Sequence, residues 1–498
     1  MKRDLPKGKE DEQAASADYD AQLAKLVRSV TGSEPLNKRP LLIADHIEDE
    51  FLREGWPTGR NFGGEAALAE RYGVGRDVLR EVVRLLEGRD HAKMRRGPHG
   101  GLEVVRPRLE DLLGRLAGYA YVTSLQRVRV LEMWTILGSV AIQLILGANA
   151  LNRVNLRVQL AQWCGQASVS MRDLGKALIA CSQSTVLTLF GTCVESLLPQ
   201  DAADLLGQST MQRLREITAS QDVEALLVGW LRNDLLPSAI ARLEAMPSER
   251  EFLPPQLPQG DYFKNQAMQV VHELMSATQP SRWSRGHLLG NEFDLAGEYG
   301  VDKSIIRQAI RLMEDAETAT ALPGRGHGLV TRLPSTAPLS KLIAAFFLAH
   351  AVDELDGERV FHALSIECAG WAAEHASAED RVALLGLCTD LKQLSAPVPI
   401  AALQCFERFQ QHAAHNPLLN VCIDAIKAFL SWRIGSCLIS SPSIVKEYKV
   451  HTERVITAIC VHDRRAAMFA EQVKLEALYF HRRQNEPIHL DEKAKYNV

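Results

Sequence analysis

Residues 54–107 read EGWPTGRNFGGEAALAERYGVGRDVLREVVRLLEGRDHAKMRRGPHGGLEVVRP, and residues 279–334 repeat this pattern as QPSRWSRGHLLGNEFDLAGEYGVDKSIIRQAIRLMEDAETATALPGRGHGLVTRLP. The two copies align at a constant offset of 227 residues. Identical residues pair as Trp56 with Trp283, Gly59 with Gly286, Glu65 with Glu292, Leu68 with Leu295, Gly73 with Gly300, Arg80 with Arg307, Gly97 with Gly324, Gly101 with Gly328 and Pro107 with Pro334. A repeat of this length indicates duplicated domains rather than a short-period solenoid.

Each copy has the pattern of three helices followed by a glycine-rich hairpin. In the first copy, apolar residues at helical spacing (Ile43, Ile47 and Phe51) predict an amphipathic first helix, and Val270 and Leu274 do so in the second. Residues 65–72 predict a second helix, Gly73 a left-handed turn, and residues 76–87 a third helix. The segments MRRGPHGGLEVV and ALPGRGHGLVTR predict two short strands around a glycine-rich tip. This combination is a winged helix, and we call each of the two copies a head.

The length of 498 residues exceeds what one hydrophobic core serves, because domains usually hold about 100 to 200 residues. With the repeat, it predicts a mainly α fold with small β wings, built from two winged-helix and two all-α domains. The expected order is a flexible arm (1–38), a first winged helix (39–107), a first helical domain (108–246), a linker (247–261), a second winged helix (262–334), a second helical domain (335–485) and a tail (486–498).

Composition and charge predict a cytoplasmic protein. The formal net charge is only -4, so nucleic-acid binding has to come from local cationic patches. The nine cysteines form no C-x-x-C pair, as expected for buried apolar residues in a reducing compartment. No signal-peptide pattern opens the sequence, and apolar runs such as LIAAFFLAH are too short to cross a bilayer.

The third helix of the first copy begins with cations suited to a DNA major groove. Arg76 and Arg80 are four residues apart and therefore share a helix face, where one can bind guanine and the other a phosphate. The wing adds Lys93, Arg95, Arg96 and His99 around small glycines, which suits a minor groove or its phosphates. The alternative is a solvated face, with arginines paired locally to Asp77, Glu81 or Glu87, and an exposed hairpin without a partner.

Both copies resemble the winged helix of the GntR family of bacterial transcription factors. The shared pattern is P-x-G, then E-x-x-L-A-x-x-x-G-V-x-R-x-x-x-R, then a glycine-rich wing, with minor departures in each copy. The helical segments that follow resemble the effector domain of the FadR-type branch. The resemblance implies that the second and third helices and the wing bind operator DNA. It also implies that the helical domain dimerises and holds a small effector that changes the spacing of the heads.

Carried over residue by residue, the resemblance places DNA contacts at Arg76, Arg80, His99 and Gly100, and at Lys303, Arg307 and His327. The complete predicted DNA-binding set is Arg76, Arg80, Arg84, Lys93, Arg95, Arg96, His99, Gly100, Lys303, Ser304, Arg307, Arg325 and His327.

Departures from the family pattern predict unequal heads. Ala66 and Phe293 stand where the family has a charged residue, which removes one expected contact from each head. Residues 63–105 hold eight Lys/Arg against seven Asp/Glu, whereas residues 290–332 hold five against seven. We call the third helix of each copy its recognition helix, since this is the helix expected to enter the DNA groove. Asp302, at the start of the second recognition helix, is expected to face DNA and lower affinity. We therefore expect different half-sites for the two heads, or most of the affinity from the first.

The resemblance also implies a metal site of one aspartate and three histidines, but the residues argue against it. The first helical domain has no histidine, since none occurs between His99 and His272. In the second, alignment places Leu403, Glu407, Thr452 and Lys474 at the ligand positions, with His451 one residue away. No metal or other cofactor is therefore expected. Candidate effector-binding residues are Arg359, Glu367 and Glu407, which suit a small acidic or acyl effector; alternatively they are an exposed charge and its partner.

These features together predict a sequence-specific DNA-binding regulator, a repressor that responds to a small effector. One chain supplies both heads as a fused pseudo-dimer, and pairing with a second copy stays open at this point. An enzyme is not expected, because the sequence has no P-loop, no G-x-S-x-G and no dinucleotide fingerprint. The remaining alternative is a co-regulatory or interaction protein whose second head no longer binds DNA.

Overall fold

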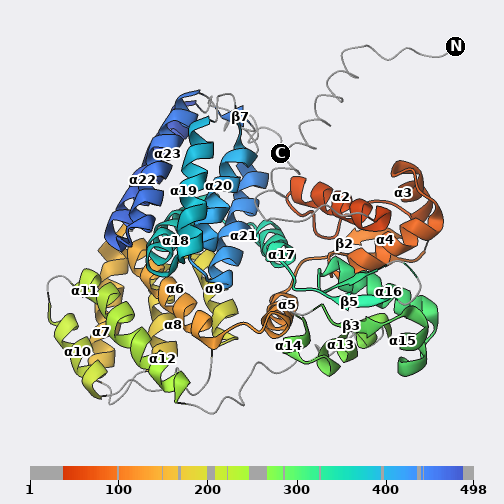
Figure 1. Cartoon of the computed structure of the whole chain (residues 1–498), viewed down its shortest axis with the longest axis horizontal. Coiled ribbons are helices and arrows are strands. Elements are labelled where there is room, and N and C mark those ends of the chain that lie inside the picture. The colour runs from red at the N-terminus through yellow and green to blue at the C-terminus, as the bar shows by residue number, and fades with distance from the viewer. Residues whose placement is uncertain are drawn as a thin grey trace. The chain divides into compact units, whose positions relative to one another are not determined.

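The computed structural model describes residues 38–97, 100–147, 150–165, 170–198, 208–220, 223–245, 266–283, 286–322, 324, 327–393, 398–434, 439–440 and 442–485. These residues are mostly helical with a few short strands, as predicted (Figure 1). The expected linker and tail, and the arm up to residue 37, lie outside the described residues.

The chain divides into two compact units, and the finer division into four domains stays a prediction. The winged-helix unit comprises the described residues of Thr31–Gly357 and Asp424–Arg433, and the C-terminal helical unit comprises those of Glu358–Ile423 and Ile434–Val498. Both predicted winged helices and the first helical segment therefore belong to one unit.

The first head consists of α2 (Arg39–Arg53), α3 (Glu65–Arg71), α4 (Arg76–Gly88) and the hairpin β1 (Ala92–Arg95) and β2 (Gly101–Val104). The strands are antiparallel. Helix α2 buries Leu41, Ala44, Ile47 and Phe51, while Ile43 is only half-buried. The buried residues recur at helical spacing, so α2 packs one apolar face onto α4.

The second head contains the same order of helices and hairpin. Its elements are α13 (Gln266–Ala277), α14 (Pro280–Trp283), β3 (Leu288–Gly290), α15 (Glu292–Tyr299), α16 (Lys303–Asp315), β4 (Ala319–Ala321) and β5 (Leu329–Thr331). The sheet order is β3-β5-β4, all antiparallel. Strand β3 and helix α14 were not predicted. The first head has only a single bridge, Asn61 to Glu103, in the place of β3.

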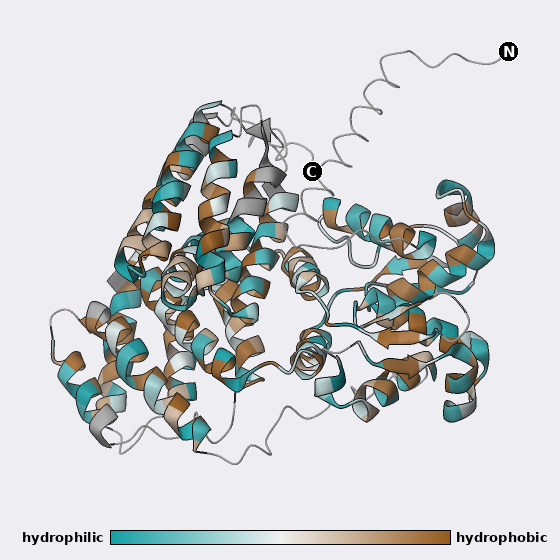
Figure 2. Ribbon diagram, in the orientation of Figure 1, coloured by the Kyte–Doolittle hydropathy of each residue, from teal (hydrophilic) through white to brown (hydrophobic). Residues whose placement is uncertain are grey.

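Amphipathic recognition helices link each hairpin to its core. Figure 2 shows hydrophilic and hydrophobic residues mixed along both α4 and α16. Helix α4 buries Leu79, Val82 and Leu86 and exposes the polar face between them. Helix α16 buries Ile306, Ala309, Leu312 and Met313 in the same way. The polar face of each helix is therefore available to a partner.

Two pairs of repeated glycines have a physical requirement for glycine. Gly73 and Gly300 turn the chain with φ of 61° and 62°, the left-handed region that costs other residues energy. Gly101 and Gly328 are needed for space. A Cβ on Gly101 would lie 2.7 Å from the Gly63 carbonyl oxygen, and one on Gly328 would lie 2.3 Å from that of Gly290. The second wing strand thus approaches the segment before the second helix closely in both heads.

The helical part of the winged-helix unit follows each head. It contains α5 (Leu109–Val122), α6 (Arg127–Gly147), α7 (Ala150–Cys164), α8 (Met171–Ser182), α9 (Thr185–Glu195), α10 (Gln208–Thr218), α11 (Val223–Trp230), the π-helical turn η1 (Leu231–Leu235), α12 (Leu236–Glu244) and α17 (Ala337–Ala349). Helix α17 contacts α5, so the segments after the two heads meet.

Helix α6 is long and apolar enough to cross a bilayer, contrary to the expectation that the apolar runs are too short. This helix of 21 residues has a mean hydropathy of 1.7 over its most apolar window, enough for a span by length and composition. However, 78% of that window is buried inside the protein. Such burial is typical of the central helix of a folded domain, and α6 packs against α8, α9 and α12.

The C-terminal helical unit is built from long helices. These are α18 (Glu354–His375) from Glu358 onward, α19 (Ala378–Gln393), α20 (Ile400–His412), α21 (Pro417–Ile434) up to Ile423, α22 (Pro442–Cys460) and α23 (Arg464–Asn485). Strands β6 (Val398–Pro399) and β7 (Ile439–Ser440) form a small antiparallel pair. Helices α22 and α23 pack together most extensively, and α19 packs on α22.

We predict that Gly101→Ala and Gly328→Ala each destabilise their head. The added methyl group would overlap a backbone carbonyl, and such overpacking costs about 1–3 kcal/mol. Gly114→Ala is the matched control, because its Cβ would meet nothing within 4 Å and alanine favours the helix α5. Urea unfolding followed by tryptophan fluorescence measures the change. Equal midpoints for all three variants would contradict the prediction.

Candidate nucleic-acid interface

The exposed face of α4 carries the predicted cations of the first head. Arg76, Arg80 and Arg84 are exposed, and Asp77 beside them is fully exposed. Within the described residues no ion pair involves Arg76 or Arg84. Gly75 precedes the helix in an extended conformation and leaves its N-terminus without a side-chain cap. The first turn of α4 therefore offers backbone N–H groups and arginines together, an arrangement that favours anions.

Arg80 and Arg307 make the same ion pair in the two heads. Arg80 Nε lies 2.8 Å from Glu65 Oε1, and Arg307 Nε lies 2.7 Å from Glu292 Oε1. Each glutamate is the first residue of the preceding helix, α3 or α15. The arginine side chains remain 56% and 65% exposed. The carboxylates hold the guanidinium groups in place at the surface. The expected pairing of Arg80 with Asp77 exists at 3.7 Å, but the shorter pair, with Glu65, was not among the expected ones.

The wing of each head is attached to the end of its recognition helix. Glu87 accepts a hydrogen bond from the Met94 N–H at 3.0 Å, and Glu314 accepts one from the Ala321 N–H, also at 3.0 Å. The two glutamates occupy matched positions of the repeat. In both heads a glutamate side chain therefore links the end of the recognition helix to the first wing strand. The sequence had suggested only a local arginine pair for Glu87.

The cations of the first wing differ in their surroundings. Lys93 and Arg96 are exposed, whereas Arg95 pairs with Glu103 on the facing strand. Arg95 Nη2 donates to Glu103 Oε1 at 2.7 Å. At the wing tip a Cβ on Gly100 would lie 2.3 Å from the Arg95 carbonyl oxygen, so the tight turn needs glycine there. His99 lies outside the described residues.

The second head presents a different surface. Lys303, Ser304 and Arg307 are exposed on α16, and His327 is exposed at the wing, while Arg325 lies outside the described residues. Phe293 is 70% exposed, and the Lys303 ammonium lies 4.6 Å from the centre of its ring. An exposed aromatic side chain is thus held beside the start of the recognition helix, where the first head has Ala66.

Asp302 is exposed and caps its own helix, and the expectation that it faces DNA stays a prediction. Asp302 is the N-cap of α16, and its Oδ1 accepts the Ser304 N–H at 2.7 Å. Hydrogen bonds from Ser304 hold the pKa of Asp302 below its ordinary value. Asparagine and aspartate are favoured N-caps because they satisfy free N–H groups of the first turn. The carboxylate therefore serves the helix itself.

The candidate effector residues of the C-terminal helical unit lie in different surroundings. Arg359 is exposed, whereas Glu367, on the same helix, is fully buried and accepts a hydrogen bond from Arg464 Nη2 at 2.8 Å. Eight residues on a helix correspond to a rotation of about 80° beyond two full turns, and here this rotation separates an exposed side chain from a buried one. Glu407 belongs to another group of polar residues.

Glu407 is part of a buried polar cluster, which we define as Glu407, Gln410, Tyr448, Glu471 and Lys474. Lys474 Nζ lies 2.8 Å from a carboxylate oxygen of both Glu407 and Glu471. Tyr448 Oη donates to Glu407 Oε1 at 2.8 Å, and Gln410 Nε2 donates to Glu471 Oε2 at 3.0 Å. Burial opposes the charge of Lys474, but the two carboxylates outweigh it and raise its pKa. Burial also raises the pKa of Glu471.

This cluster does not fit the divalent metal that the family resemblance implies. The Tyr448 hydroxyl oxygen, 2.8 Å from Glu407 Oε1, also lies 2.9 Å from the Leu403 carbonyl oxygen, so the aligned ligand positions Leu403, Glu407 and Lys474 converge. An ammonium group has no lone pair to ligate a cation and repels it electrostatically. Among the described residues, no group of three or more His, Cys, Asp or Glu side chains could hold a metal ion.

Comparisons with known proteins assign no family. No protein-family model matches the sequence. No curated protein matches it either. Among solved structures, Streptococcus agalactiae GntR matches with a TM-score of 0.33 and 16% sequence identity, over 43% of this chain and 99% of that one. At this level of likeness the match establishes no relationship of fold or function.

We predict that Glu65→Ala and Glu292→Ala reduce discrimination between specific and random DNA. Without the carboxylate, each arginine has to be ordered on binding, which costs about 1 kcal/mol, or roughly a five-fold loss of discrimination. Non-specific affinity is expected to rise, because a negative charge near DNA is removed. Competition binding with random duplex DNA measures both effects.

Glu216→Ala is the control for this prediction, since it removes an equally charged side chain from an exposed pair with Arg213 on α10. Discrimination that falls equally in the control, or in none of the variants, would show that the carboxylates do not orient the arginines.

Proposed function

We propose that this protein is a sequence-specific DNA-binding transcriptional regulator whose single chain carries two DNA-reading heads. The observation that carries the proposal is the matched set of exposed arginines, Arg80 and Arg307, each held by a glutamate beside a recognition helix and a glycine-rich wing. Helix N-termini with arginines suit base edges and phosphates, and wings suit minor grooves. Within this proposal, the repeat represents a duplicated unit and the chain acts as a pseudo-dimer.

We further propose that the two heads contribute unequally. The first head offers Arg76, Arg84, Lys93 and Arg96 in addition to Arg80. In the second head, Lys303 is engaged with Phe293, and fewer cations surround Arg307. Linkage in one chain raises the effective concentration of the second head once the first is bound. A weak second head is therefore sufficient, and the operator need not be palindromic.

The engaged Lys303 and the acidic balance of the second head also favour the alternative function. In that case the protein is a co-regulator whose second head contacts the first or another protein but no DNA. The two functions predict different results for Arg307→Ala: a weaker affinity for DNA if the second head binds DNA, and an unchanged affinity if it does not.

We propose repression as the mode of regulation and a small effector as its signal. Two heads bound side by side occupy a promoter segment and exclude polymerase from it. The buried polar cluster is the candidate effector site, because Gln410 Oε1 and Glu471 Oε1 are buried without a hydrogen bond to any described residue. Buried polar atoms usually have partners, so such atoms suit a bound polar molecule. The exposure of Arg359 gives an acidic effector less support than the sequence predicted.

We predict that Arg80→Ala weakens operator binding by about 1–3 kcal/mol if the guanidinium contacts a base, or lowers the salt slope by about 1 if it contacts a phosphate. Arg307→Ala is expected to have a smaller effect of the same kind. The operator is first selected from a random duplex library with the purified full chain, and affinities are then measured by mobility shift at several salt concentrations.

Arg213→Ala, on α10 outside both heads, controls for the loss of one positive charge. Failure to enrich any sequence would remove the proposed function. If Arg80→Ala weakens binding but Arg307→Ala changes neither the affinity nor the salt slope, only the first head reads DNA and the co-regulator alternative is supported.

We predict that Gln410→Ala and Glu471→Gln change the response to small molecules without changing operator affinity in their absence. The cluster belongs to the C-terminal helical unit, whereas the DNA-reading arginines belong to the heads. The measurement is release of labelled operator DNA by pools of small polar metabolites. A pool that releases wild type and both variants alike would place the effector elsewhere.

A further inference from the structure

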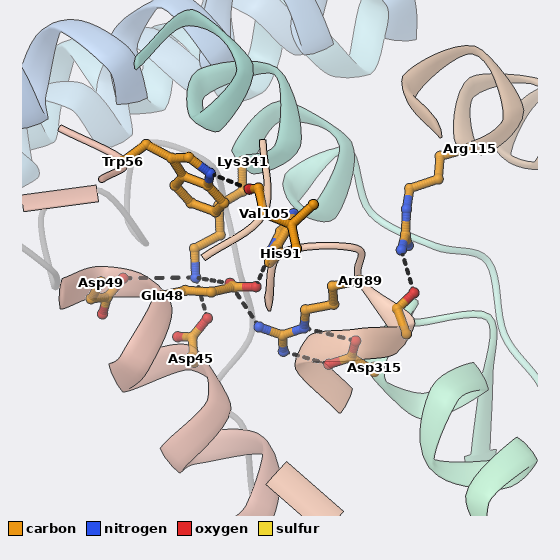
Figure 3. A network of polar contacts seen from close by, with 11 residues as sticks. Asp45, Glu48, Asp49, Trp56, Arg89, His91, Val105, Arg115, Asp315 and Lys341 are labelled. Carbon is orange, nitrogen blue, oxygen red and sulfur yellow. Dashed lines mark hydrogen bonds and ion pairs between the residues drawn. The ribbon is translucent and has the colours of Figure 1, made fainter. Parts of the chain in front are cut away.

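A buried group of charges joins the first head to the second. Arg89, directly after α4, makes a bidentate pair with Asp315 at the end of α16, with Nε to Oδ2 at 2.9 Å and Nη2 to Oδ1 at 2.5 Å (Figure 3). Arg89 Nη1 also lies 2.7 Å from Glu48 Oε2 on α2. The side chains of Arg89, Glu48 and Asp315 are only 12%, 2% and 8% exposed. One guanidinium therefore links two helices of the first head to the recognition helix of the second.

A lysine from beyond the second head completes this group. Lys341, on α17, pairs with Asp45 and lies 3.3 Å from Glu48 and 3.7 Å from Asp49, all on α2 (Figure 3). Burial opposes the charge of Lys341, but the three carboxylates raise its pKa. Burial likewise disfavours ionised Glu48, yet Arg89, His91 and Lys341 hold its pKa well below the ordinary value. The group is therefore charged and internally paired. We call Asp45, Glu48, Asp49, Arg89, Asp315 and Lys341 the inter-head ion cluster.

Close helix contact surrounds the cluster. Recognition helices α4 and α16 touch each other, and a Cβ on Gly88 would lie 2.3 Å from Leu312 Cδ2. Arg311 Nε lies 2.5 Å from Glu81 Oε1 across the same contact. The C-terminal halves of the two recognition helices are thus packed together. Arg76 and Lys303 are the first residues of these helices, at the ends away from this contact.

The cluster exists only between unlike heads. At the repeat offset, Glu48 corresponds to Met275, Arg89 to Ala316, Asp315 to Gly88 and Lys341 to Gly114. A contact between two first heads would place Arg89 opposite glycine, and one between two second heads would leave Asp315 opposite alanine. The first pairing would leave Arg89 with only Glu48 of its own head, and the second would bury Asp315 without a cation; a buried charge without a partner costs several kcal/mol. The pairing of first head with second head is therefore selected by the charges themselves.

We propose that the inter-head ion cluster fixes the spacing and rotation of the two recognition helices, so that one chain reads two unlike half-sites at a single spacing. This inference rests on the proposed function and deepens it: Arg89, Asp315 and Lys341 are positioning residues for operator recognition. In some proteins a buried polar or ionic group contributes more to the uniqueness of an arrangement than to its stability. A directional guanidinium pair accepts few alternative geometries, because both of its hydrogen bonds lie in one plane.

A fixed pair of heads has a measurable consequence on DNA. One inserted base pair moves the second half-site by about 3.4 Å and rotates it by roughly 35°. Heads on a flexible connection follow such a change, whereas a locked pair loses one of its two contacts. We expect wild-type affinity for the selected operator to fall at least about ten-fold for each single-base-pair insertion or deletion between the half-sites.

Asp315→Ala tests the positioning role. Arg89 keeps its pair with Glu48 in this variant, so the first head retains its own buried pairing. We expect the penalty for a changed spacing to drop to about three-fold or less, while affinity for a duplex carrying only the first half-site stays at the wild-type value. Asp315→Asn, which keeps the shape of the side chain, should give an intermediate penalty. Glu216→Ala is the matched control for charge and should behave as wild type.

Separate outcomes test the inference and the proposed function. If no sequence is enriched from the random library, the proposed function fails. If an operator is found and wild type binds all spacings equally, or Asp315→Ala keeps the full spacing penalty, the positioning inference is overturned. Native mass spectrometry of the complex should find one chain per operator, and two chains per operator would also overturn it. Wild-type measurements alone decide the question if both Asp315 variants fail to fold.

Discussion

The buried Arg89 guanidinium, paired with Glu48 on one side and Asp315 on the other, is the interaction on which the winged-helix unit depends. A guanidinium cannot lose its charge, so burial is tolerated only when carboxylates surround it. Those carboxylates come from α2 and α16, which belong to different heads. The need to neutralise one buried charge therefore specifies which helices meet and how they are oriented.

The repeat preserves scaffold positions and varies the charges placed on them. Gly101 and Gly328 both allow close backbone approach, and Glu87 and Glu314 both hold a wing strand. The charged residues of the inter-head cluster, by contrast, have uncharged counterparts in the other copy. A symmetric pair of identical heads could not form this cluster. Joining the heads in one chain permits an asymmetric interface, and an asymmetric interface suits two heads with different DNA-facing surfaces.

Much of each head followed from its sequence because helical periodicity, left-handed glycines and hairpin composition act locally. The second and third helices of the first head end within one residue of their predicted ends, while the first strand of each wing begins two residues before the predicted segment. The site was less predictable. The sequence did not predict that Asp302 caps α16, or that Arg80 pairs with Glu65, fifteen positions away. Whether a carboxylate caps a helix, supports an arginine or faces solvent depends on backbone geometry that residue spacing does not specify.

The sequence by itself determined the order of helices and hairpins, the glycines at turns and close contacts, and the surface positions of the arginines on α4 and α16. These features follow from interactions between residues near each other in the chain. Only the tertiary structure decided that Glu48, Arg89, Asp315 and Lys341 share one buried site, although up to 293 positions separate them. It also decided that Lys474 is bonded to Glu407 where a metal was implied. Long-range electrostatic pairing has no periodicity, because it is determined by which elements pack together and by the cost of burying a charge alone.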